Sequence, residues 1–395
     1  MLNPHLEPTI VREVAPFDID GLAMPYPDFV ARLYNYCRSL GFHKGRMMPS
    51  RAFCSDENQG LPIILLTQHF GVFPFNHGRV GGILAVGRHG PHAQHGDDLV
   101  IVQASHVGYD PGNGEYGTYR RARLTGDNRC ASCGKLTHVI APYLARYRFA
   151  RDRIFLSRDD SGRCLVTVKN SFVDFGSCPV AHGFVLRLPN MVDPDAQGLI
   201  RPIAAASATQ TYEISADFKR RLEAGGHVWK TGRGAPIGEL LTADLFFFRE
   251  KFHATDDALL LERNLIEFMP AIVSARYPAL EAAKTNIQLE FARVLESIRR
   301  CEEYKGRNLL YISGLNIDIS EYQGAPPTSY FVPWAAHVQQ AGAGGASPDD
   351  AHPVEQKDLF AALMAQSPTN PDRADLDENI LRMQEAPRLE IRERG

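Results

Sequence analysis

Apolar residues recur at helical spacing in three stretches of the chain. In residues 26–41, the side chains of Phe29, Leu33 and Cys37 fall on one face, which predicts an amphipathic helix. Two further helices are expected at residues 136–149 and 278–304. The last of these has a buried stripe made by Leu280, Ala283, Ile287, Phe291 and Leu295. Residues 61–68 fit either a helix or a buried strand.

Short, continuous apolar runs predict buried strands elsewhere. Such strands are expected at residues 81–86, 99–104 and 308–319. The second of them ends just before His106. The Pro-Gly-Asn-Gly sequence inside residues 110–115 is a strong turn signal. We therefore expect the strand before this turn and residues 116–124 after it to form a β-hairpin.

The pattern changes between residues 150 and 235. Strand-like segments are separated there by Asp, Ser, Gly, Pro and Asn, and strands are expected at residues 153–156, 164–169, 183–188 and 210–214. Helices are expected to follow at residues 240–252 and 258–269. Residues 150–235 therefore read as a β-rich enlargement of the protein.

The same pattern suggests a division of the chain. We expect an irregular, Pro-rich arm at residues 1–25, one domain at 26–335 and a flexible tail at 336–395. The tail is predicted because residues 340–353 are rich in Ala, Gly, Ser, Pro and charge. One short helix is expected within it, at residues 358–365.

Composition and charge narrow the possible functions. The chain has 395 residues, of which 44% are hydrophobic and 23% charged, as is usual for a water-soluble globular protein. Its net charge of -3 argues against nucleic acid as a partner. No secretory signal is seen at the first residues, and no apolar run is long enough for a membrane span. Seven irregularly spaced cysteines fit a reducing compartment, so a cytoplasmic location is expected.

Three separated segments carry residues that could hold a metal ion. Cys54 and Asp56 lie in a Cys-Ser-Asp-Glu turn where a strand is expected to end, and His106 follows a second predicted strand. A third segment contributes Cys130 and Cys133. Two thiolates and one imidazole make a Cys2His set with an open fourth position, which is typical of a catalytic zinc site.

Zinc in such a set would generate a hydroxide near neutral pH, which suits attack on a small carbonyl-type carbon. Asp56 could accept the proton of this hydroxide and orient it toward the substrate. Apolar walls around the substrate would come from the aromatic segment at residues 69–78. Its Phe70, Phe73 and Phe75 are the candidate substrate-binding residues.

A family resemblance rests on the order of several motifs. These are Cys54-Ser55-Asp56-Glu57, Phe73-Pro74-Phe75, His106-Val107-Gly108-Tyr109-Asp110, Arg120-Arg121-Ala122-Arg123 and Cys133-Gly134. In this order they resemble the limiting-CO2-inducible B/C family, whose members are similar to β-class carbonic anhydrases in fold and zinc site. A weaker likeness lies in Ile312-Ser313-Gly314-Leu315-Asn316-Ile317 and in Tyr330-Phe331. Residues 150–235 have no counterpart in it.

The resemblance implies a fold, an activity and a site. The fold is α/β, a central mixed β-sheet flanked by helices as in β-carbonic anhydrases, here with an enlarged middle region. The activity is reversible hydration of CO2 to bicarbonate by a homodimer. The implied zinc ligands are Cys54, His106 and Cys133, with Asp56 as their orienting partner; Cys133 is chosen over Cys130 because it keeps the Cys-Gly step.

The sequence departs from the family in one place that matters for the site. In the family an arginine shortly after the Cys-Ser-Asp-Glu turn pairs with the aspartate, whereas this chain has Asn58-Gln59-Gly60 there. Asp56 must then find another cation, for which Arg51, Arg120 and Arg121 are candidates. Without such a partner, Asp56 can move onto the metal as a fourth ligand and close the site.

Other residues with possible chemistry have simpler explanations. His89, His92 and His95 could relay protons, but a solvated polar loop explains them as well. The segment Cys178-Pro179-Val180-Ala181-His182 offers half a second metal site with no visible partner pair. Cys37, Cys164 and Cys301 are expected to be core or surface thiols.

The sequence therefore favours a zinc-dependent, β-class-like carbonic anhydrase. Two other functions fit the same residues. A catalytically silent, zinc-binding relative could act as a binding or regulatory subunit, which the Asn58-Gln59-Gly60 segment favours. A zinc hydrolase of another small substrate could use the enlarged region to shape a larger pocket.

Overall fold

The computed structural model describes residues 15–84, 98–120, 129–172, 183–232, 234–254, 256–341 and 353–385. Contacts divide the chain into two compact units. The first, here called the sheet unit, comprises Met1–Gly114, Thr118–Cys130 and Ile287–Gly395. The second, the middle unit, comprises Glu115–Gly117 and Ala131–Asn286. The expectation of one domain over residues 26–335 stays a prediction, although contacts group most of the middle of the chain into a unit of its own.

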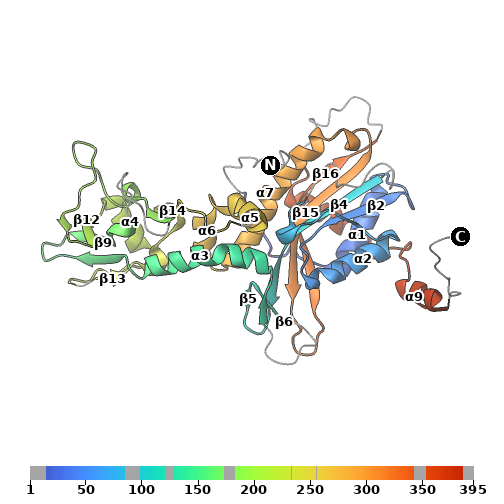
Figure 1. The fold of residues 1–395 in the computed structure, drawn as a ribbon, viewed down its shortest axis with the longest axis horizontal. Helices are drawn as coiled ribbons and strands as arrows, with labels where there is room; N and C mark the ends of the chain where they lie inside the picture. The colour runs from blue at the N-terminus through green and yellow to red at the C-terminus, as the bar shows by residue number, and fades with distance from the viewer. Residues whose placement is uncertain are drawn as a thin grey trace, which may run out of the picture. The chain divides into compact units, whose positions relative to one another are not determined.

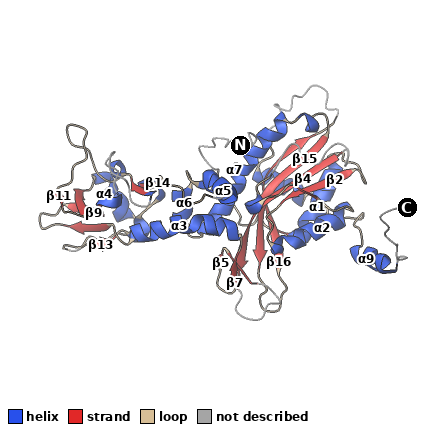
Figure 2. Cartoon of the chain, in the orientation of Figure 1, coloured by secondary structure: helices blue, strands red, loops and turns tan. Residues whose placement is uncertain are grey.

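The sheet unit is built on a mixed β-sheet in the order β1-β16-β15-β4-β2-β3 (Figure 2). The strands are β1 Met24–Pro25, β2 Met47–Ala52, β3 Phe75–Asn76, β4 Asp98–Asp110, β15 Asn308–Ile319 and β16 Thr328–Gln339. Strand β4 runs parallel to both β2 and β15, whereas β16 is antiparallel to β15. With helices on both faces, this confirms the predicted α/β class.

Strands β4 and β15 form the centre of the sheet and are buried along nearly their whole length. Strands covered on both faces carry continuous apolar runs, which explains the pattern seen in the sequence. Strand β4 nevertheless extends beyond the predicted end at Ala104 and includes His106, which pairs in register with Asn316 of β15. The apolar pattern missed this extension because the polar side chains there are buried in hydrogen bonds.

Alternate residues of β4 contribute to two separate cores, as the two-residue repeat of a strand requires. Val100 and Val102 pack under α1 Tyr26–Ser39 and α2 Gly60–Phe70, together with Phe29, Leu33, Leu66, Leu310, Ile312 and Phe331. Leu99 and Ile101 pack under the later part of α7 Pro278–Arg300, together with Phe291, Val294, Leu309 and Tyr311. Figure 1 shows α1 and α2 on one side of the sheet and α7 on the other.

The predicted helices at residues 26–41 and 278–304 are confirmed by α1 and α7, and the ambiguous run at 61–68 lies in α2. The predicted strand at residues 81–86 is wrong, because residues Val80–Gly82 form a single 3-10 turn with Gly81 at a φ of 76°. Among the described helices, none combines the length and apolarity that a bilayer crossing requires.

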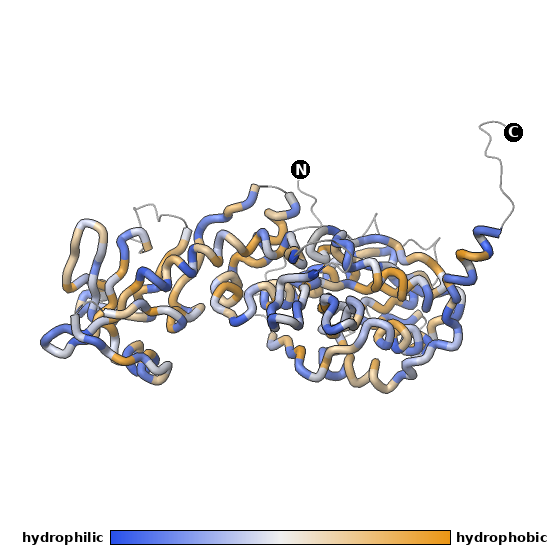
Figure 3. The backbone as a smooth tube through the Cα atoms, turned by 90° about the horizontal axis from the view of Figure 1, so that it is seen from below, coloured by the Kyte–Doolittle hydropathy of each residue, from blue (hydrophilic) through white to orange (hydrophobic). Residues whose placement is uncertain are grey.

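Part of the expected C-terminal tail belongs to the core. Helix α8 Gln356–Met364 packs against α1, and its Leu359 and Leu363 have no exposed surface. Arg32 of α1 donates to the carbonyl of Met364 over 2.8 Å. The short helix expected at residues 358–365 is confirmed by α8. The low-complexity composition of residues 340–353 concealed its packing on the core, because the apolar face begins only after that stretch. Helix α9 Leu376–Glu385 follows and alternates between hydrophilic and hydrophobic residues (Figure 3).

The middle unit contains a five-stranded antiparallel sheet in the order β11-β12-β9-β8-β13. Its strands are β8 Phe155–Arg158, β9 Cys164–Lys169, β11 Ala204–Ala205, β12 Thr209–Glu213 and β13 Ala235–Pro236. Its helices are α3 Gly134–Arg151, α4 Ala216–Ala224, α5 Asp256–Leu265, α6 Met269–Ser274 and the start of α7. The strands expected between residues 150 and 235 are confirmed in type, and α3 confirms the helix expected at 136–149.

The helix expected at residues 240–252 is wrong. Residues Phe246–Phe248 form strand β14, which pairs with β10 Phe184–Leu186. Three consecutive phenylalanines favour a strand, and the ring of Phe184 stacks on that of Phe246 with centroids 4.9 Å apart. This cross-strand aromatic packing outweighs the helical spacing of the leucines before it.

A single truncation tests whether α8 belongs to the core. Leu363→Ala should lower the free energy of unfolding by about 2–5 kcal/mol, because it leaves a cavity beneath a fully buried side chain. Met364→Ala is the matched control, since that neighbouring side chain is 45% exposed and should change stability by about 0.5 kcal/mol or less. Chemical denaturation measures both. Equal effects of the two substitutions would show that α8 does not pack as described.

Candidate metal centre

Cys54 lies just beyond the carboxyl end of a parallel strand. Strand β2 ends at Ala52, Cys54 follows two residues later, and its side chain is only 1% exposed. The chain then turns through Asp56 into a 3-10 turn and α2. In open α/β sheets, ligands bind in the crevice outside the carboxyl ends of such strands. The prediction that a strand ends before this thiol is confirmed.

A glycine-rich loop closes over the Cys54 sulfur. The backbone N–H of Gly81 donates to Cys54 Sγ over 3.3 Å. A Cβ on Gly82 would lie 2.2 Å from the carbonyl oxygen of Ala104, and one on Gly78 would lie 2.2 Å from that of Phe53. Only glycine allows the loop to come this close. A backbone N–H aimed at a sulfur stabilises negative charge on it, as a metal ligand requires.

Two buried contacts from the sheet fix this loop. Gln103 Nε2 donates to the carbonyl of Gly82 over 2.9 Å, and Gln103 in turn accepts a hydrogen bond from Tyr311. Ser105 Oγ donates to the carbonyl of Gly81 over 3.4 Å. The residues that hold the loop therefore lie on β4 itself, directly before His106.

A buried ion pair on α7 holds the other end of the loop. Arg293 and Glu290 are bonded over 2.6 Å, with side chains 7% and 1% exposed. Arg293 also donates to the carbonyl of Leu84 over 2.6 Å, and the N–H of Leu84 donates to Glu290 over 3.4 Å. Both backbone groups of Leu84 are thus satisfied by one pair of side chains. Such a pair is costly to break, because removing one partner leaves a buried charge.

His106 sits between two carboxylates. Its ring has no exposed surface, with Nδ1 lying 2.8 Å from Asp318 Oδ2 and Nε2 lying 3.2 Å from Asp56 Oδ2. If Nδ1 donates its proton to Asp318, the lone pair of Nε2 points toward the Asp56 carboxylate. The Nε2 lone pair and the Asp56 carboxylate repel each other unless a positive charge lies between them. Either a second proton on the His106 ring or a metal ion supplies that charge.

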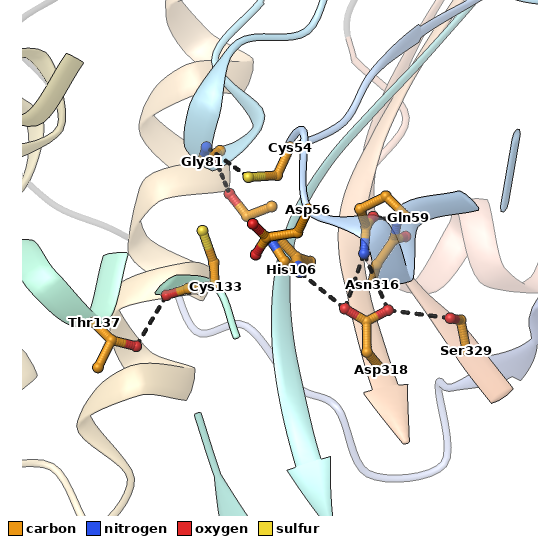
Figure 4. Close-up of polar contacts among 11 residues, drawn as sticks. Cys54, Asp56, Gln59, Gly81, His106, Cys133, Thr137, Asn316, Asp318 and Ser329 are labelled. Atoms are coloured by element: carbon orange, nitrogen blue, oxygen red, sulfur yellow. Dashed lines mark hydrogen bonds and ion pairs between the residues drawn. The ribbon is translucent and has the colours of Figure 1, made fainter. Parts of the chain in front are cut away.

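Asp318 is the residue that orients His106, and sequence reasoning missed it. Gln59 Nε2 donates to both of its carboxylate oxygens, over 3.1 and 2.9 Å, and Ser329 Oγ donates to Oδ1 over 3.1 Å (Figure 4). Burial raises the pKa of Asp318, whereas the hydrogen bonds from His106, Ser329 and Gln59 oppose that rise. A histidine that donates its other nitrogen to a fixed carboxylate has the geometry usual for a metal ligand.

Gln59 gives the Asn58-Gln59-Gly60 segment a structural role. The Gln59 side chain is 1% exposed, and its Oε1 accepts a hydrogen bond from Asn316 over 2.7 Å. Gln59 thus links the turn that carries Asp56 to the strand that carries Asp318. The sequence did contain a signal for this network, because Asn316 and Asp318 interrupt an otherwise apolar strand.

Cys133 immediately precedes α3, and its side chain is 2% exposed. Its carbonyl accepts a hydrogen bond from Thr137 Oγ1 over 2.9 Å, which fixes the first turn of the helix (Figure 4). Cys130 lies in strand β7 Arg129–Ala131, which pairs with β6 Thr118–Arg120. The thiol of Cys130 donates to the carbonyl of Tyr119 over 3.3 Å.

The structure brings four possible ligands together. One atom from each of Cys54, Asp56, His106 and Cys133 lies within 4.8 Å of all the others, and all but Asp56 are buried. Atoms bound to a tetrahedral zinc are about 3.3–3.8 Å apart, so small side-chain movements would satisfy the geometry. Thiolate, imidazole and carboxylate are all zinc ligands, and the two thiolates disfavour magnesium and calcium. The donor set therefore fits zinc.

Comparisons with known proteins agree with this site. Residues 23–151 match the model of the family described as limiting CO2-inducible proteins B/C β-carbonic anhydrases. This part of the chain resembles that family. The matched segment includes all four residues of the cluster. None of the curated proteins matches the chain.

Two solved structures resemble the chain. One is PtLCIB4, a homologue of the limiting CO2-inducible protein LCIB, at 12% identity and a TM-score of 0.47, covering 85% of this chain and 95% of that one. The other is the limiting CO2-inducible protein LCIB, at 12% identity and a TM-score of 0.40, covering 85% and 96%. At this low identity and TM-score, neither structure carries an argument about the function of the chain.

Two of the arginines expected to serve this site are among the described residues. Arg120 Nε is 3.6 Å from Asp110, so its ion pair is with that carboxylate. Arg51 has no carboxylate within ion-pair distance in the part of the chain that the structure describes, and burial lowers its pKa. The assignment of Arg51 or Arg120 as the Asp56 partner therefore stays a prediction. Arg121, His89, His92, His95 and the segment 178–182 lie outside the described residues.

The three phenylalanines expected to form a dry wall have separate environments. Phe70 packs against Tyr34 in the core, with ring centroids 5.4 Å apart. Phe73 is 77% exposed. Phe75 contacts His77, with centroids 5.7 Å apart. The sequence grouped them because they are close along the chain, and Phe70 is the last residue of α2. Their role as substrate-binding residues stays a prediction.

The role of Asp318 can be tested through metal affinity. Asp318→Asn should weaken zinc binding about 10- to 100-fold, because an amide cannot fix the proton on His106 Nδ1 as a carboxylate does. Ser329→Ala is the control, since it removes only a hydrogen bond to the distal oxygen Oδ1. Competition with a chromogenic chelator measures both affinities. Equal zinc affinity in Asp318→Asn and the parent protein would exclude the orienting role.

Proposed function

We propose that the protein catalyses the reversible hydration of CO2 to bicarbonate as a zinc-dependent, β-class-like carbonic anhydrase. The observation that carries this proposal is the convergence of two thiols, one imidazole and Asp56 within 4.8 Å of one another. The match of residues 23–151 to a family described as β-carbonic anhydrases supports the same reaction.

The residues at the site would have separate roles in binding the metal. Cys54, His106 and Cys133 would hold the metal, and zinc supplies a Lewis acid that activates water as a nucleophile near neutral pH. Asp318 keeps the proton on His106 Nδ1, which leaves Nε2 as the coordinating atom. Gly81 donates its N–H to Cys54 and so favours the charged form of that sulfur.

Asp56 would have the catalytic role. Its side chain is 33% exposed, whereas the His106 ring beside it has no exposed surface. Asp56 is thus the member of the cluster through which a proton can pass to solvent. We infer that the Asp56 carboxylate accepts the proton released during hydration and orients the attacking oxygen toward CO2.

Two further expectations from the sequence accompany this proposal. By its family resemblance the protein would act as a homodimer, and its cysteine usage fits a cytoplasmic location. The substrates would be CO2 and bicarbonate, with no nucleic acid or membrane as a partner.

One observation favours a second function. Asp56 lies within the ligand set, so the cluster offers four protein ligands rather than three. Sites with four protein ligands are typical of structural zinc. If Asp56 stays on the metal, the protein would be a catalytically silent relative that acts as a binding or regulatory subunit.

Metal analysis tests the ligand set. Cys54→Ala, His106→Ala and Cys133→Ala should each abolish retention of zinc after dialysis, because each removes one strong donor. Cys130→Ala is the control, since its thiol bonds to the Tyr119 carbonyl and should leave zinc content unchanged. Mass spectrometry of the purified proteins gives the zinc content. A full zinc complement in any of the three variants rejects that ligand.

Stopped-flow CO2 hydration separates the two functions. If Asp56 moves the proton, Asp56→Ala should keep zinc and lose about 10²- to 10⁴-fold in kcat. If Asp56 instead closes the site as a fourth ligand, the parent protein should be inactive and Asp56→Ala should gain activity. Unchanged rates would remove both roles.

A further inference from the structure

The middle unit contains a cavity of about 440 Å³. It lies where α3 ends, α6 ends and α7 begins, three elements that are near one another in Figure 1. Its lining consists of Leu144, Tyr147, Arg148, Arg151, Glu239, Val273, Ser274, Ala275, Arg276 and Pro278. A volume of this size is typical of sites for small organic molecules.

The cavity is positively charged. Three arginines and one carboxylate line it, which gives the lining a net charge of +2. Arg151 and Glu239 are bonded to each other over 2.6 Å. Arg148 and Arg276 have no carboxylate within ion-pair distance among the described residues. The guanidinium groups of Arg148 and Arg276 are therefore available to bind an anionic ligand.

Two of the three arginines lie against neighbouring aromatic rings. Arg151 lies over the ring of Tyr147, 6.0 Å from its centroid, and Arg276 lies over that of Tyr277 at 5.2 Å. Tyr147 is itself fixed, because its hydroxyl donates to the carbonyl of Leu241 over 3.2 Å. A planar, oriented guanidinium loses less conformational freedom when it binds an oxyanion.

The start of α7 adds to the attraction for anions. This helix has 23 residues and begins at Pro278, which lines the cavity. The first N–H groups of a helix lack partners within it, and its dipole is positive at this end. The acidic residue of the first turn, Glu281, pairs with Lys284 over 3.4 Å and is not part of the lining.

Part of the cavity lining forms an apolar wall. Leu144, Val273 and Ala275 supply it, and Tyr147 adds an aromatic face. We propose that this cavity binds a small organic phosphate. The phosphate group would bridge Arg148 and Arg276, while the organic part rests on the apolar wall. Bidentate contacts between guanidinium and phosphate make arginine the preferred residue for such recognition. This site is independent of the proposed carbonic anhydrase activity.

Two of the arginines also have a simpler role than phosphate binding, which is to stabilise the end of a helix. Arg148 and Arg151 lie in the last turn of α3, where positive charge stabilises the end of a helix dipole. That role requires no ligand and predicts only a change in stability. Arg276 lies between α6 and α7, outside any helix, so dipole stabilisation does not account for it.

Isothermal titration calorimetry with phenyl phosphate and inorganic phosphate tests the proposal on the full chain. Both should bind, and phenyl phosphate should bind more tightly because its ring contacts the apolar wall. Arg148→Gln and Arg276→Gln should each weaken binding of phenyl phosphate about 10- to 100-fold, the effect of removing a charged hydrogen-bond donor.

Arg220→Gln is the matched control. That arginine belongs to the same unit, is 73% exposed and pairs with Asp217 away from the cavity lining, so its loss should leave binding unchanged. Three results would overturn the proposal. These are no binding at millimolar phenyl phosphate, equal affinities for the two probes, and a lower melting temperature of Arg148→Gln with unaltered binding.

Discussion

The pairing of β4 with β15 is the constraint on which the site depends. These two strands are parallel and in register, so that His106 lies opposite Asn316 and Asp318 follows two residues later on the same face. A shift of one residue would turn Asp318 to the other side of the sheet. The apolar runs on both strands, which are buried from both faces, set this register. The hydrophobic core thus fixes the hydrogen bond that orients the metal-binding histidine.

Further buried contacts support the other residues of the metal centre around strands β4 and β15. Gln59 connects Asp318 to the turn that bears Asp56, and the loop at Gly81 brings a backbone donor to Cys54. The loop is held from the sheet by Gln103 and from α7 by a buried ion pair. Every ligand in the sheet unit therefore has a support that is itself buried. Such supports keep ligand atoms in place when no metal is bound.

The sequence was informative where a pattern extends over many residues. The helices α1 and α7 and the strand β15 follow from periodicity, because each presents a long apolar face to one core. The metal-binding segments were recognisable because thiols and imidazoles are rare and chemically distinctive. Asp318 and Gln59 escaped because their role depends on which strands are neighbours, and one sequence carries no register. The roles expected for Phe73 and Arg120 stay predictions for the same reason, since closeness along the chain does not fix the direction of a side chain.

The order of the elements along the chain has a consequence for biosynthesis. Strand β4 is made early, whereas its partner β15 follows only after the whole middle unit. The middle unit is almost continuous in sequence and can fold while the ribosome is still adding residues. The sheet, in contrast, stays open along one edge of β4 until β15 emerges. During that interval an apolar strand is exposed, so the nascent chain is a natural client for chaperones.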